Sequence, residues 1–269
     1  MKSNYKYIVG LPLIVLLILN LVFYFSLNAQ SSLQTISHRG AAGLAPENTQ
    51  LGIETAILND AKITEVDVRR TKDGVWILMH DERLTRTTNG SGKVSDRPWE
   101  YIRELKVNHD FEDISNTIRV PTLNSVLEKL KSQDIRLIIE IKGSFENAEM
   151  ANEILAVVEK NRVKRKVIFA SFDQELLKLL KSLDQDISIG LFTFFPKKPD
   201  PELEQVEFVG VNWSTVFTTP WLVKPILDAD IPLWVWTVNS GLLKRKLARR
   251  GVKGIITDRP DIEIEAGAN

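Results

Sequence analysis

Short β-rich runs alternate with amphipathic stretches along most of this 269-residue chain, and this alternation restricts its fold more than any other feature. The β-rich runs lie at residues 35–38, 63–68, 75–80, 136–142, 166–170, 188–193, 208–213, 233–238 and 254–257. Helical patterns lie between most of them, at residues 49–59, 122–131, 147–159, 173–183, 220–227 and 242–249. Regular β–α alternation predicts a parallel sheet, and eight such units close into a barrel. We therefore predict an α/β protein with a TIM (β/α)8 barrel over residues 35–264.

Nine β-rich runs are one more than such a barrel needs. The turn formers at residues 72–74 leave no room for a crossover helix, so the run at 75–80 is expected to return antiparallel to the run at 63–68. If this hairpin turns on the last two of those three residues, Asp67 lies opposite His80. The extra strand is then an addition to the barrel and not one of its eight strands.

Residues 83–120 have no strong periodicity and are rich in turn-forming residues. We predict that they form a small inserted cap after the third strand, folded over the rim of the barrel, where loops build binding sites. The cap contains His109, which we expect to be structural or exposed to solvent. Among the helices, Thr219 is expected to cap the pattern at 220–227, with Pro220 in its first turn.

The first 29 residues have a different character from the rest. Lys2 and Lys6 precede a nearly unbroken apolar run at residues 8–25, which approaches the length that crosses a membrane. We predict a single-pass anchor with the catalytic domain outside the cytoplasm; a cleaved signal, giving a secreted or periplasmic protein, is the alternative. The predicted order is anchor or signal 1–29, linker 30–34, barrel 35–264 and tail 265–269.

Composition excludes several kinds of chemistry. Lysine plus arginine and aspartate plus glutamate number 35 each, so no overall field attracts nucleic acid. The chain has no cysteine, which excludes thiolate metal sites and cysteine nucleophiles. It has only three histidines, so an imidazole acid/base pair must come from those three. Composition says nothing about the oligomeric state.

Three carboxylates in apolar strands suggest a metal site. Glu65 and Asp67 are two residues apart in a strand pattern, so both side chains leave on one face, and burying them together requires a compensating cation. Glu140 ends another apolar strand and needs a partner, which could be the same metal, Lys142 or Arg136. Two surface carboxylates on an edge strand are the alternative for the first pair. An all-oxygen ligand set suits one Mg²⁺ or Ca²⁺ better than zinc.

Two histidines stand at the ends of predicted strands. His38 ends the first and is followed by Arg39, whose guanidinium can hold a phosphate with two hydrogen bonds; His80 ends the third. Barrel enzymes keep their sites at such ends, so the pair suggests acid/base catalysis. Glu47 and Asn48 open the first helix, where they either cap it or orient the site.

The motifs, taken in order, resemble those of the glycerophosphodiester phosphodiesterases of the phospholipase-C-like superfamily. The matching segments are residues 38–40, 46–49, 65–68, 71–74, 80–81, 84–88, 140–142, 236–239 and 254–260. The resemblance implies a distorted TIM barrel, a metal site of Glu65, Asp67 and Glu140, and catalytic residues His38 and His80. It also implies substrate contacts from Arg39, Lys142 and Trp236, with Glu47 and Asn48 in support.

The resemblance implies hydrolysis of glycerophosphodiesters to glycerol 3-phosphate and an alcohol, with a cyclic phosphate intermediate. Phe192, Phe194 and Phe195 raise a second possibility, because apolar residues on the rim followed by lysines could meet a lipid surface and a lysophospholipid substrate. Core packing of Phe192 and one neighbour is the simpler interpretation. A barrel that binds a phosphorylated ligand without turnover, or another kind of barrel enzyme, is the remaining alternative.

Overall fold

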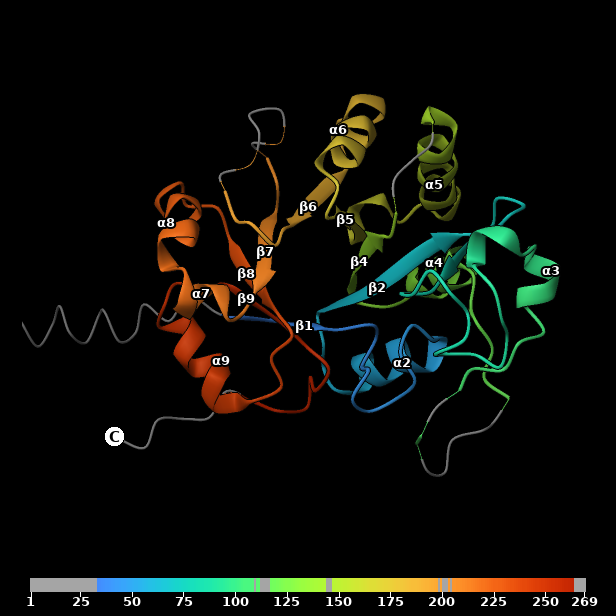
Figure 1. Cartoon of the computed structure of the whole chain (residues 1–269), viewed down its shortest axis with the longest axis horizontal. Helices are drawn as coiled ribbons and strands as arrows, with labels where there is room; N and C mark the ends of the chain where they lie inside the picture. Colours follow the sequence, from blue (N-terminus) through green and yellow to red (C-terminus); the bar gives the residue numbers. More distant parts are fainter. Residues whose placement is uncertain are drawn as a thin grey trace, which may run out of the picture. The chain divides into compact units, whose positions relative to one another are not determined.

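A computed structural model describes residues 33–263 of the chain, except residues 109, 112–116, 144–146, 198, 200–202 and 204. Its strands, labelled in Figure 1 except for β3, are β1 Gln34–Ser37, β2 Ile63–Arg70, β3 Trp76–Leu78, β4 Arg136–Ile141, β5 Val167–Ser171, β6 Ser188–Phe192, β7 Phe208–Asn212, β8 Leu233–Trp236 and β9 Gly254–Thr257. Its helices are α2 Gln50–Leu58, α3 Trp99–Ile102, α4 Leu123–Leu130, α5 Ala148–Asn161, α6 Gln174–Leu183, α7 Thr215–Thr218, α8 Pro220–Asp228 and α9 Gly241–Ala248, with short 3-10 turns at Val94–Asp96 and Lys164–Lys166. Every predicted β-rich run and helical pattern corresponds to one of these elements.

Eight of the strands form the predicted closed parallel barrel. Their order is β1-β9-β8-β7-β6-β5-β4-β2, and a parallel pairing of β1 with β2 closes the ring. The closing pair is short, joining only Ile36 to Ile63 and Ser37 to Thr64, because the second half of the long β2 pairs with β3 instead. The barrel is therefore distorted at this seam, and the seam lies beside the residues predicted to form the site.

The antiparallel hairpin of β2 and β3 is confirmed, but its predicted register is wrong by one residue. Val68 pairs with Leu78, and the amide of Met79 bonds the carbonyl of Asp67, so that Met79 lies opposite Asp67 in place of His80. The turn has three residues, closed by Thr71 and Val75, with Gly74 at φ +85°. A glycine in the left-handed region at the end of a three-residue loop is a common hairpin solution, and one extra residue shifts every pairing.

Several helices begin where their capping residues stand. The side chains of Thr49, Thr122, Asn147 and Asp173 accept hydrogen bonds from backbone amides in the first turns of α2, α4, α5 and α6. The predicted cap at Thr219 is wrong, since its hydroxyl bonds the carbonyl of Thr215 at 3.2 Å. Thr219 also stands at the end of α7, and its side chain bonds that helix and not α8. Pro220 occupies the first turn of α8, as predicted.

The barrel interior is filled by a buried layer of apolar side chains from all eight barrel strands, two of them from β5. They are Ile36, Ile63, Ile138, Ile168, Ala170, Phe192, Phe208, Trp234 and Ile256. The rings of Phe208 and Trp234 stack with centroids 4.0 Å apart. A Cβ on Gly190 would lie 2.2 Å from the Phe208 ring, so this glycine makes room for it. The layer closes the barrel below the predicted site, which is how TIM barrels keep a packed core and not a pore.

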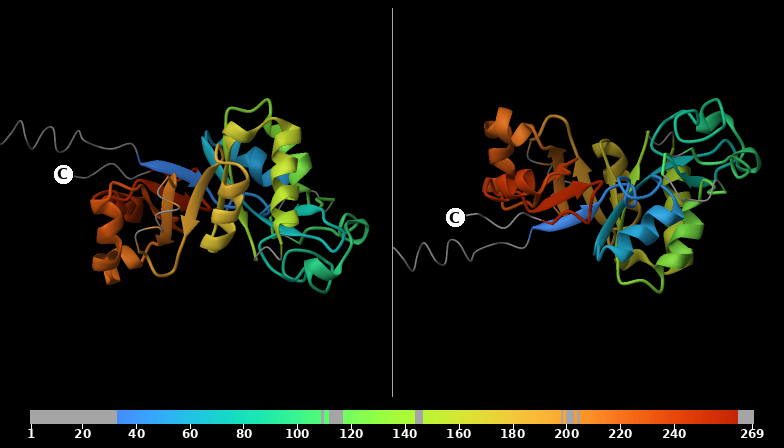
Figure 2. Two further views of the ribbon diagram at one scale, coloured as in Figure 1. Left: turned by 90° about the horizontal axis from the view of Figure 1, so that it is seen from above. Right: turned by 90° about the horizontal axis from the view of Figure 1, so that it is seen from below.

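The described residues of 83–120 pack against the β2–β3 hairpin and share a small apolar core with it. Its buried members are Ile77, Met79, Leu84, Val94, Ile102, Leu105, Val107 and Val120. Both views in Figure 2 show this teal segment beside the barrel on the side away from α8 and α9. The described part of the predicted cap thus lies against the hairpin that carries His80.

Some predictions concern residues outside the described part of the chain. These are the anchor or signal at 1–29, most of the linker, His109 and the tail at 265–269. Within residues 33–263, apart from the gaps given above, none of the helices has the length and apolar character needed to span a bilayer.

Candidate active site

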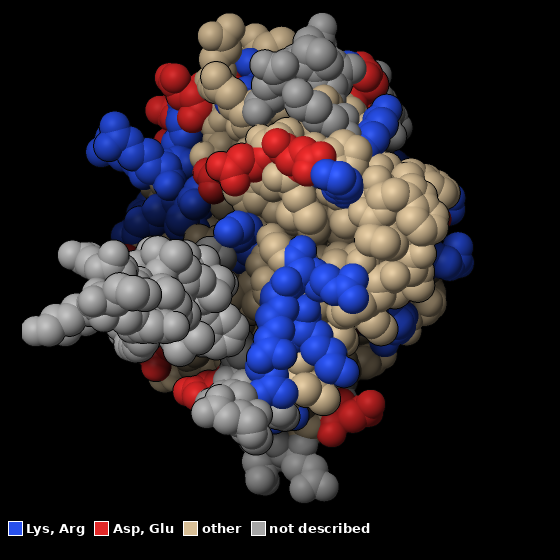
Figure 3. All heavy atoms as spheres, turned by 90° about the vertical axis from the view of Figure 1, so that its left-hand side faces the viewer, with Lys and Arg blue, Asp and Glu red and all other residues tan. Residues whose placement is uncertain are grey.

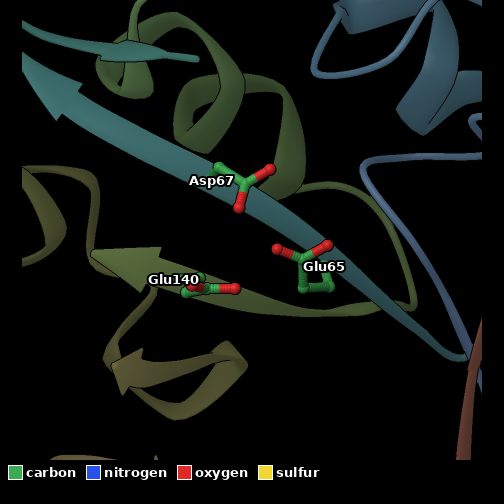
Figure 4. A group of neighbouring side chains, drawn as sticks. All are labelled: Glu65, Asp67 and Glu140. Carbon is green, nitrogen blue, oxygen red and sulfur yellow. The ribbon is translucent and has the colours of Figure 1, made fainter. Parts of the chain in front are cut away.

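The structure brings the three predicted metal ligands together. Glu65 and Asp67 leave β2 on one face, and the register of the neighbouring strand places Glu140 beside Asp67. The three side chains are buried, with exposed fractions of 1%, 1% and 7%, and one oxygen from each lies within 4.8 Å of the others. Figure 4 shows the carboxylates turned toward one another. The surface alternative for Glu65 and Asp67 is therefore wrong.

Burial and mutual repulsion oppose the ionisation of two of these carboxyls. Burial, and then the charges of Asp67 and Glu140, hold the pKa of Glu65 well above its ordinary value, and burial raises the pKa of Glu140 to about 7. Burial acts in the same direction on Asp67, but Lys142 and Arg39 outweigh it and leave its pKa lowered. The site is thus short of positive charge when all three carboxyls are ionised.

A divalent cation would supply the positive charge that the three carboxylates lack. Glu65 Oε1 is buried and has no hydrogen-bond partner among the described residues, although a buried carboxylate oxygen normally has one. The donors are carboxylate oxygens without sulfur or imidazole in the cluster, which suits a hard cation such as Mg²⁺ or Ca²⁺. Lys142 Nζ also lies 3.0 Å from Asp67 Oδ1 and contacts Glu140, so the lysine supplies part of the compensating charge.

We expect the stabilisation of the fold by added Mg²⁺ or Ca²⁺ to grow with pH. Without a cation, Glu140 keeps its proton in the folded protein up to a pKa of about 7, whereas the unfolded chain releases it near 4.5, so the metal-free fold loses stability across that interval. A cation binds the ionised carboxylates and reverses the loss. The Tm measured in millimolar cation should exceed the Tm measured in EDTA by an amount that increases from about pH 5 to about pH 8. A gap that narrows with pH would contradict this.

Each predicted catalytic histidine is held by a carboxylate. His38 Nδ1 lies 2.6 Å from Asp258 Oδ1, and His80 Nδ1 lies 2.7 Å from Asp81 Oδ1. With Nδ1 engaged, Nε2 is the nitrogen left for a substrate. His38 Nε2 lies 4.0 Å from a carboxylate oxygen of Glu65, which places it beside the acidic cluster. Burial lowers the pKa of His80, so this imidazole is neutral at neutral pH and can accept a proton.

The residues after β1 surround the acidic cluster with hydrogen bonds. The Arg39 amide donates to Glu65 at 2.9 Å, and its guanidinium lies 3.3 Å from Asp67 and 2.9 Å from Glu47. Asn48 donates to Asp67 Oδ2 at 2.8 Å and accepts from the Asp67 amide at 2.9 Å. Arg39 and Asn48 both have positive φ, a strained conformation that clusters at functional sites. Asn48 therefore orients the site, while Thr49 caps the helix.

A cavity of about 210 Å³ opens onto these groups. His38, Arg39, Glu65, His80, Glu140 and Lys142 line its polar side, and Phe172, Phe192, Phe194 and Trp236 line its aromatic side. The Trp236 ring meets Phe172 and Phe192 edge-on, with centroids 5.4 and 5.2 Å away. None of the described residues of 83–120 lines this cavity.

The structure adds functional residues that the sequence alone did not assign. Asp258 and Asp81 are the partners of the two histidines, and Arg86 bonds Asp81 at 2.7 Å. All three lie in the segments that carry the family resemblance, but the resemblance alone assigned no role to any of them. Phe172, the first residue after β5, has no motif around it, and only the fold shows that it forms a wall of the cavity.

Buried carboxylates suited to a hard cation, a guanidinium suited to phosphate and two oriented imidazoles define the class: a metal-dependent barrel enzyme that acts on phosphate esters. The family described as "Glycerophosphoryl diester phosphodiesterase family" matches residues 38–262. The chain belongs to this family. It is an enzyme of the glycerophosphodiester phosphodiesterase class, as predicted.

Relatives and solved structures agree with this assignment. Glycerophosphodiester phosphodiesterases of Caldanaerobacter subterraneus and Bacillus subtilis are each 31% identical to this chain, and the alignments cover 85% of it and 95% and 84% of the relatives. The crystal structure of the Thermotoga maritima enzyme aligns with a TM-score of 0.68 at 28% identity, over 85% of this chain and 96% of that one. An Oleispira antarctica phosphodiesterase, solved with the product sn-glycerol-3-phosphate, aligns with a TM-score of 0.70 at 25% identity, over 85% and 94%.

Proposed function

We propose that this site hydrolyses glycerophosphodiesters to glycerol 3-phosphate and an alcohol, with His38 and His80 as acid and base and Glu65, Asp67 and Glu140 as ligands of one divalent cation. The observation that carries the proposal is the convergence in one cavity of a buried, undercompensated carboxylate cluster and two imidazoles held by carboxylates. The product bound to the Oleispira antarctica enzyme is consistent with this substrate class.

Arg39 and Lys142 are placed to hold the phosphate. Both line the cavity beside the acidic cluster, and both keep their positive charge, because the nearby carboxylates outweigh the effect of burial and raise the pKa of each. A cation bound by the three carboxylates supplies further charge neutralisation at the phosphate oxygens. Trp236 and its aromatic neighbours suit the carbon backbone of the glycerol.

The chemistry needs two proton transfers in each of two steps. One histidine takes the proton of the glycerol 2-hydroxyl as its oxygen attacks phosphorus, and the other gives a proton to the departing alcohol as the P–O bond breaks. Water then opens the cyclic phosphate with the roles of the histidines reversed. Both imidazoles are anchored through Nδ1, so each can perform either transfer through Nε2.

The metal requirement can be tested with glycerophosphocholine. We expect EDTA-treated enzyme to release no choline, and added Mg²⁺ or Ca²⁺ to restore release, the better of the two being the physiological choice. Full activity in EDTA would contradict a functional metal site, and restoration by zinc alone would contradict a hard-cation site.

A specific observation favours lysophospholipids as second substrates. Phe194 and Phe195, after β6, have exposed fractions of 66% and 82%, so the simpler interpretation holds for Phe192, which is core, but not for either neighbour. The Phe194 ring stacks on Phe172 at 4.7 Å, and Phe172 continues the aromatic wall into the cavity. An apolar path therefore leads from the surface to the site, and an acyl chain could occupy it.

The variant Phe195→Ser separates the two substrate classes. Losing contact with one phenylalanine side chain, worth about 1.5–3 kcal/mol, should lower activity on lysophosphatidylcholine by about tenfold or more and leave glycerophosphocholine unaffected. Leu58→Ser is the matched control, since Leu58 is 83% exposed but belongs to α2 and not to the site. Equal losses on both substrates, or no activity on the lysophospholipid, would exclude this second function.

We further propose that residues 1–29 anchor the protein in a membrane, with the barrel outside the cytoplasm. The support is the apolar run in the sequence and a basic surface near the start of β1, whose Gln34 amide bonds the carbonyl of Lys253. No acidic residue occurs in 231–257, which includes α9, and Figure 3 shows a strip of Lys and Arg on the side of the barrel where α8 and α9 lie. Basic side chains on that surface suit contact with anionic lipid headgroups.

Membrane fractionation with an N-terminal sequence of the mature chain tests this location. An anchor predicts an intact N-terminus in the membrane fraction that resists carbonate extraction. A mature chain that begins near residue 31 supports signal cleavage, and a full-length chain in the cytosolic fraction contradicts both.

A further inference from the structure

Arg86 makes a double fork between two carboxylates at the edge of the site. Its Nε and Nη2 donate to the two oxygens of Asp81 at 2.7 and 3.0 Å. Its Nη1 and Nη2 donate to the two oxygens of Glu47 at 2.7 and 2.8 Å. Paired hydrogen bonds of this kind fix orientation as well as position, because the guanidinium and both carboxylates are planar.

Each of these carboxylates holds a residue of the proposed mechanism. Asp81 Oδ1 lies 2.7 Å from His80 Nδ1, and Glu47 Oε1 accepts a hydrogen bond from the Arg39 guanidinium at 2.9 Å. The contacts form one continuous chain from His80 through Asp81, Arg86 and Glu47 to Arg39. The proposed acid/base residue and the proposed phosphate-binding residue are thereby tied to each other through Arg86.

The segment that carries Arg86 is itself held firmly. Leu84 and Thr88 on either side are buried, at 0% and 1% exposure. The amide and hydroxyl of Thr88 both bond the Leu84 carbonyl, and the Leu84 amide bonds the Gly92 carbonyl. Arg86 therefore projects from a rigid turn of the 83–120 segment, which gives that segment a role in the site although none of its described residues lines the cavity.

The charge balance also depends on Arg86. Burial raises the pKa of Glu47, but the hydrogen bond from Arg86 and the charge of Arg39 outweigh it and leave that pKa lowered. The Arg86 hydrogen bond is the main cause that lowers the pKa of Asp81. Both carboxylates thus stay ionised and remain acceptors for His80 and Arg39.

We propose that Arg86 is a positioning residue of the reaction, which holds His80 and Arg39 in their working orientation through Asp81 and Glu47. This inference rests on the proposed roles of His80 and Arg39. A purely stabilising role is a poor account of the arrangement, because the Arg86 side chain is 46% exposed and ion pairs so exposed contribute little to folding.

The kinetic test uses Arg86→Gln and Arg86→Lys with the full-length enzyme and glycerophosphocholine. Loss of a partner that orients a catalytic group costs about 10- to 100-fold in activity, so we expect a fall of that size in kcat/KM for Arg86→Gln. Lysine keeps the charge but not the fork, so Arg86→Lys should recover part of the loss. Arg103→Ala is the matched control, an exposed arginine of the same segment whose ion pair among the described residues is with the adjacent Glu104 at 3.3 Å. Its activity should equal that of wild type.

A second readout separates positioning from general loosening. The chain has three histidines, so their ring ¹⁵N signals can be assigned by substitution. Arg86→Gln should shift the His80 signals and leave those of His38, whose partner Asp258 bonds Asn239 instead. Equal shifts in both histidines, or a Tm fall that accounts for the lost activity, would overturn the proposal.

The double variant Arg86→Gln/Asp81→Asn completes the test. Arg86→Gln removes the contacts to both Asp81 and Glu47, and Asp81→Asn removes only the support of His80, so the double variant should lose less than the sum of the two single losses, whereas fully additive losses would contradict the relay through Asp81. His80→Ala in the same assay separates a failure of the proposed function from a failure of the role proposed for Arg86. If His80→Ala stays active, the proposed function fails. If His80→Ala is inactive while Arg86→Gln stays within about twofold of wild type, only this inference fails.

Discussion

Replacing His38 or His80 with alanine should lower kcat on glycerophosphocholine by about 10²–10⁴-fold, the usual contribution of a positioned acid or base. KM should change far less, because Arg39, Lys142 and the metal site remain to bind the phosphate. Both steps of the proposed reaction need both imidazoles, so the double variant should lose little more than either single variant.

The third histidine provides the control for this experiment. His109→Ala removes an imidazole from the 83–120 segment and should leave kcat unchanged. Circular dichroism and Tm for all three variants show whether the fold is intact. Near-wild-type turnover in folded His38→Ala or His80→Ala protein would remove that residue from the mechanism.

The substitution Glu65→Gln should act in opposite directions on activity and on metal-free stability. Activity should fall by about 10²-fold or more, because the site loses a charged ligand whose cation contributes several kcal/mol to transition-state stabilisation. The metal-free variant should nevertheless unfold at a higher temperature than metal-free wild type. The folded-state pKa of Glu65 is raised by burial and by Asp67 and Glu140, so this carboxyl destabilises the fold once the pH exceeds its unfolded value.

The gain in stability should therefore be absent near pH 4, where the carboxyl is protonated in both states, and grow as the pH rises. Addition of Mg²⁺ or Ca²⁺ should raise the Tm of the variant less than that of wild type. Glu128→Gln, an exposed glutamate of α4, should change neither activity nor Tm. A Glu65→Gln protein with normal activity, or one less stable than wild type without metal, would contradict the assigned role.

The barrel could be predicted because its signals are local. Strand and helix patterns alternate in the sequence, and residues such as Thr49, Thr122 and Asp173 cap the helices through hydrogen bonds that span only two or three residues. The two predictions about the fold that were wrong also have local causes. The register of β2 with β3 depends on whether the turn has two or three residues, and Thr219 stands between two helices that compete for its side chain.

The site was predictable only as a set of residue types at strand ends. The sequence placed Glu65 and Asp67 on one face, but the pairing of Asp67 with Glu140 depends on the register of strands far apart in the chain. The partner of His38 lies 220 residues away, and Arg86 reaches across 39 residues to Glu47. Such contacts arise from closure of the barrel and packing of the 83–120 segment, and no spacing in the sequence encodes them.

One measurement tests the central claim most directly: ³¹P NMR of glycerophosphocholine incubated with the enzyme, in EDTA and then with added Mg²⁺ or Ca²⁺. The account predicts no change in EDTA, followed on addition of the cation by conversion to glycerol 3-phosphate, with choline as the other product. Formation of phosphocholine or inorganic phosphate would show that a different bond is broken. Conversion in EDTA at the same rate would show that the Glu65, Asp67 and Glu140 cluster does not hold a catalytic metal.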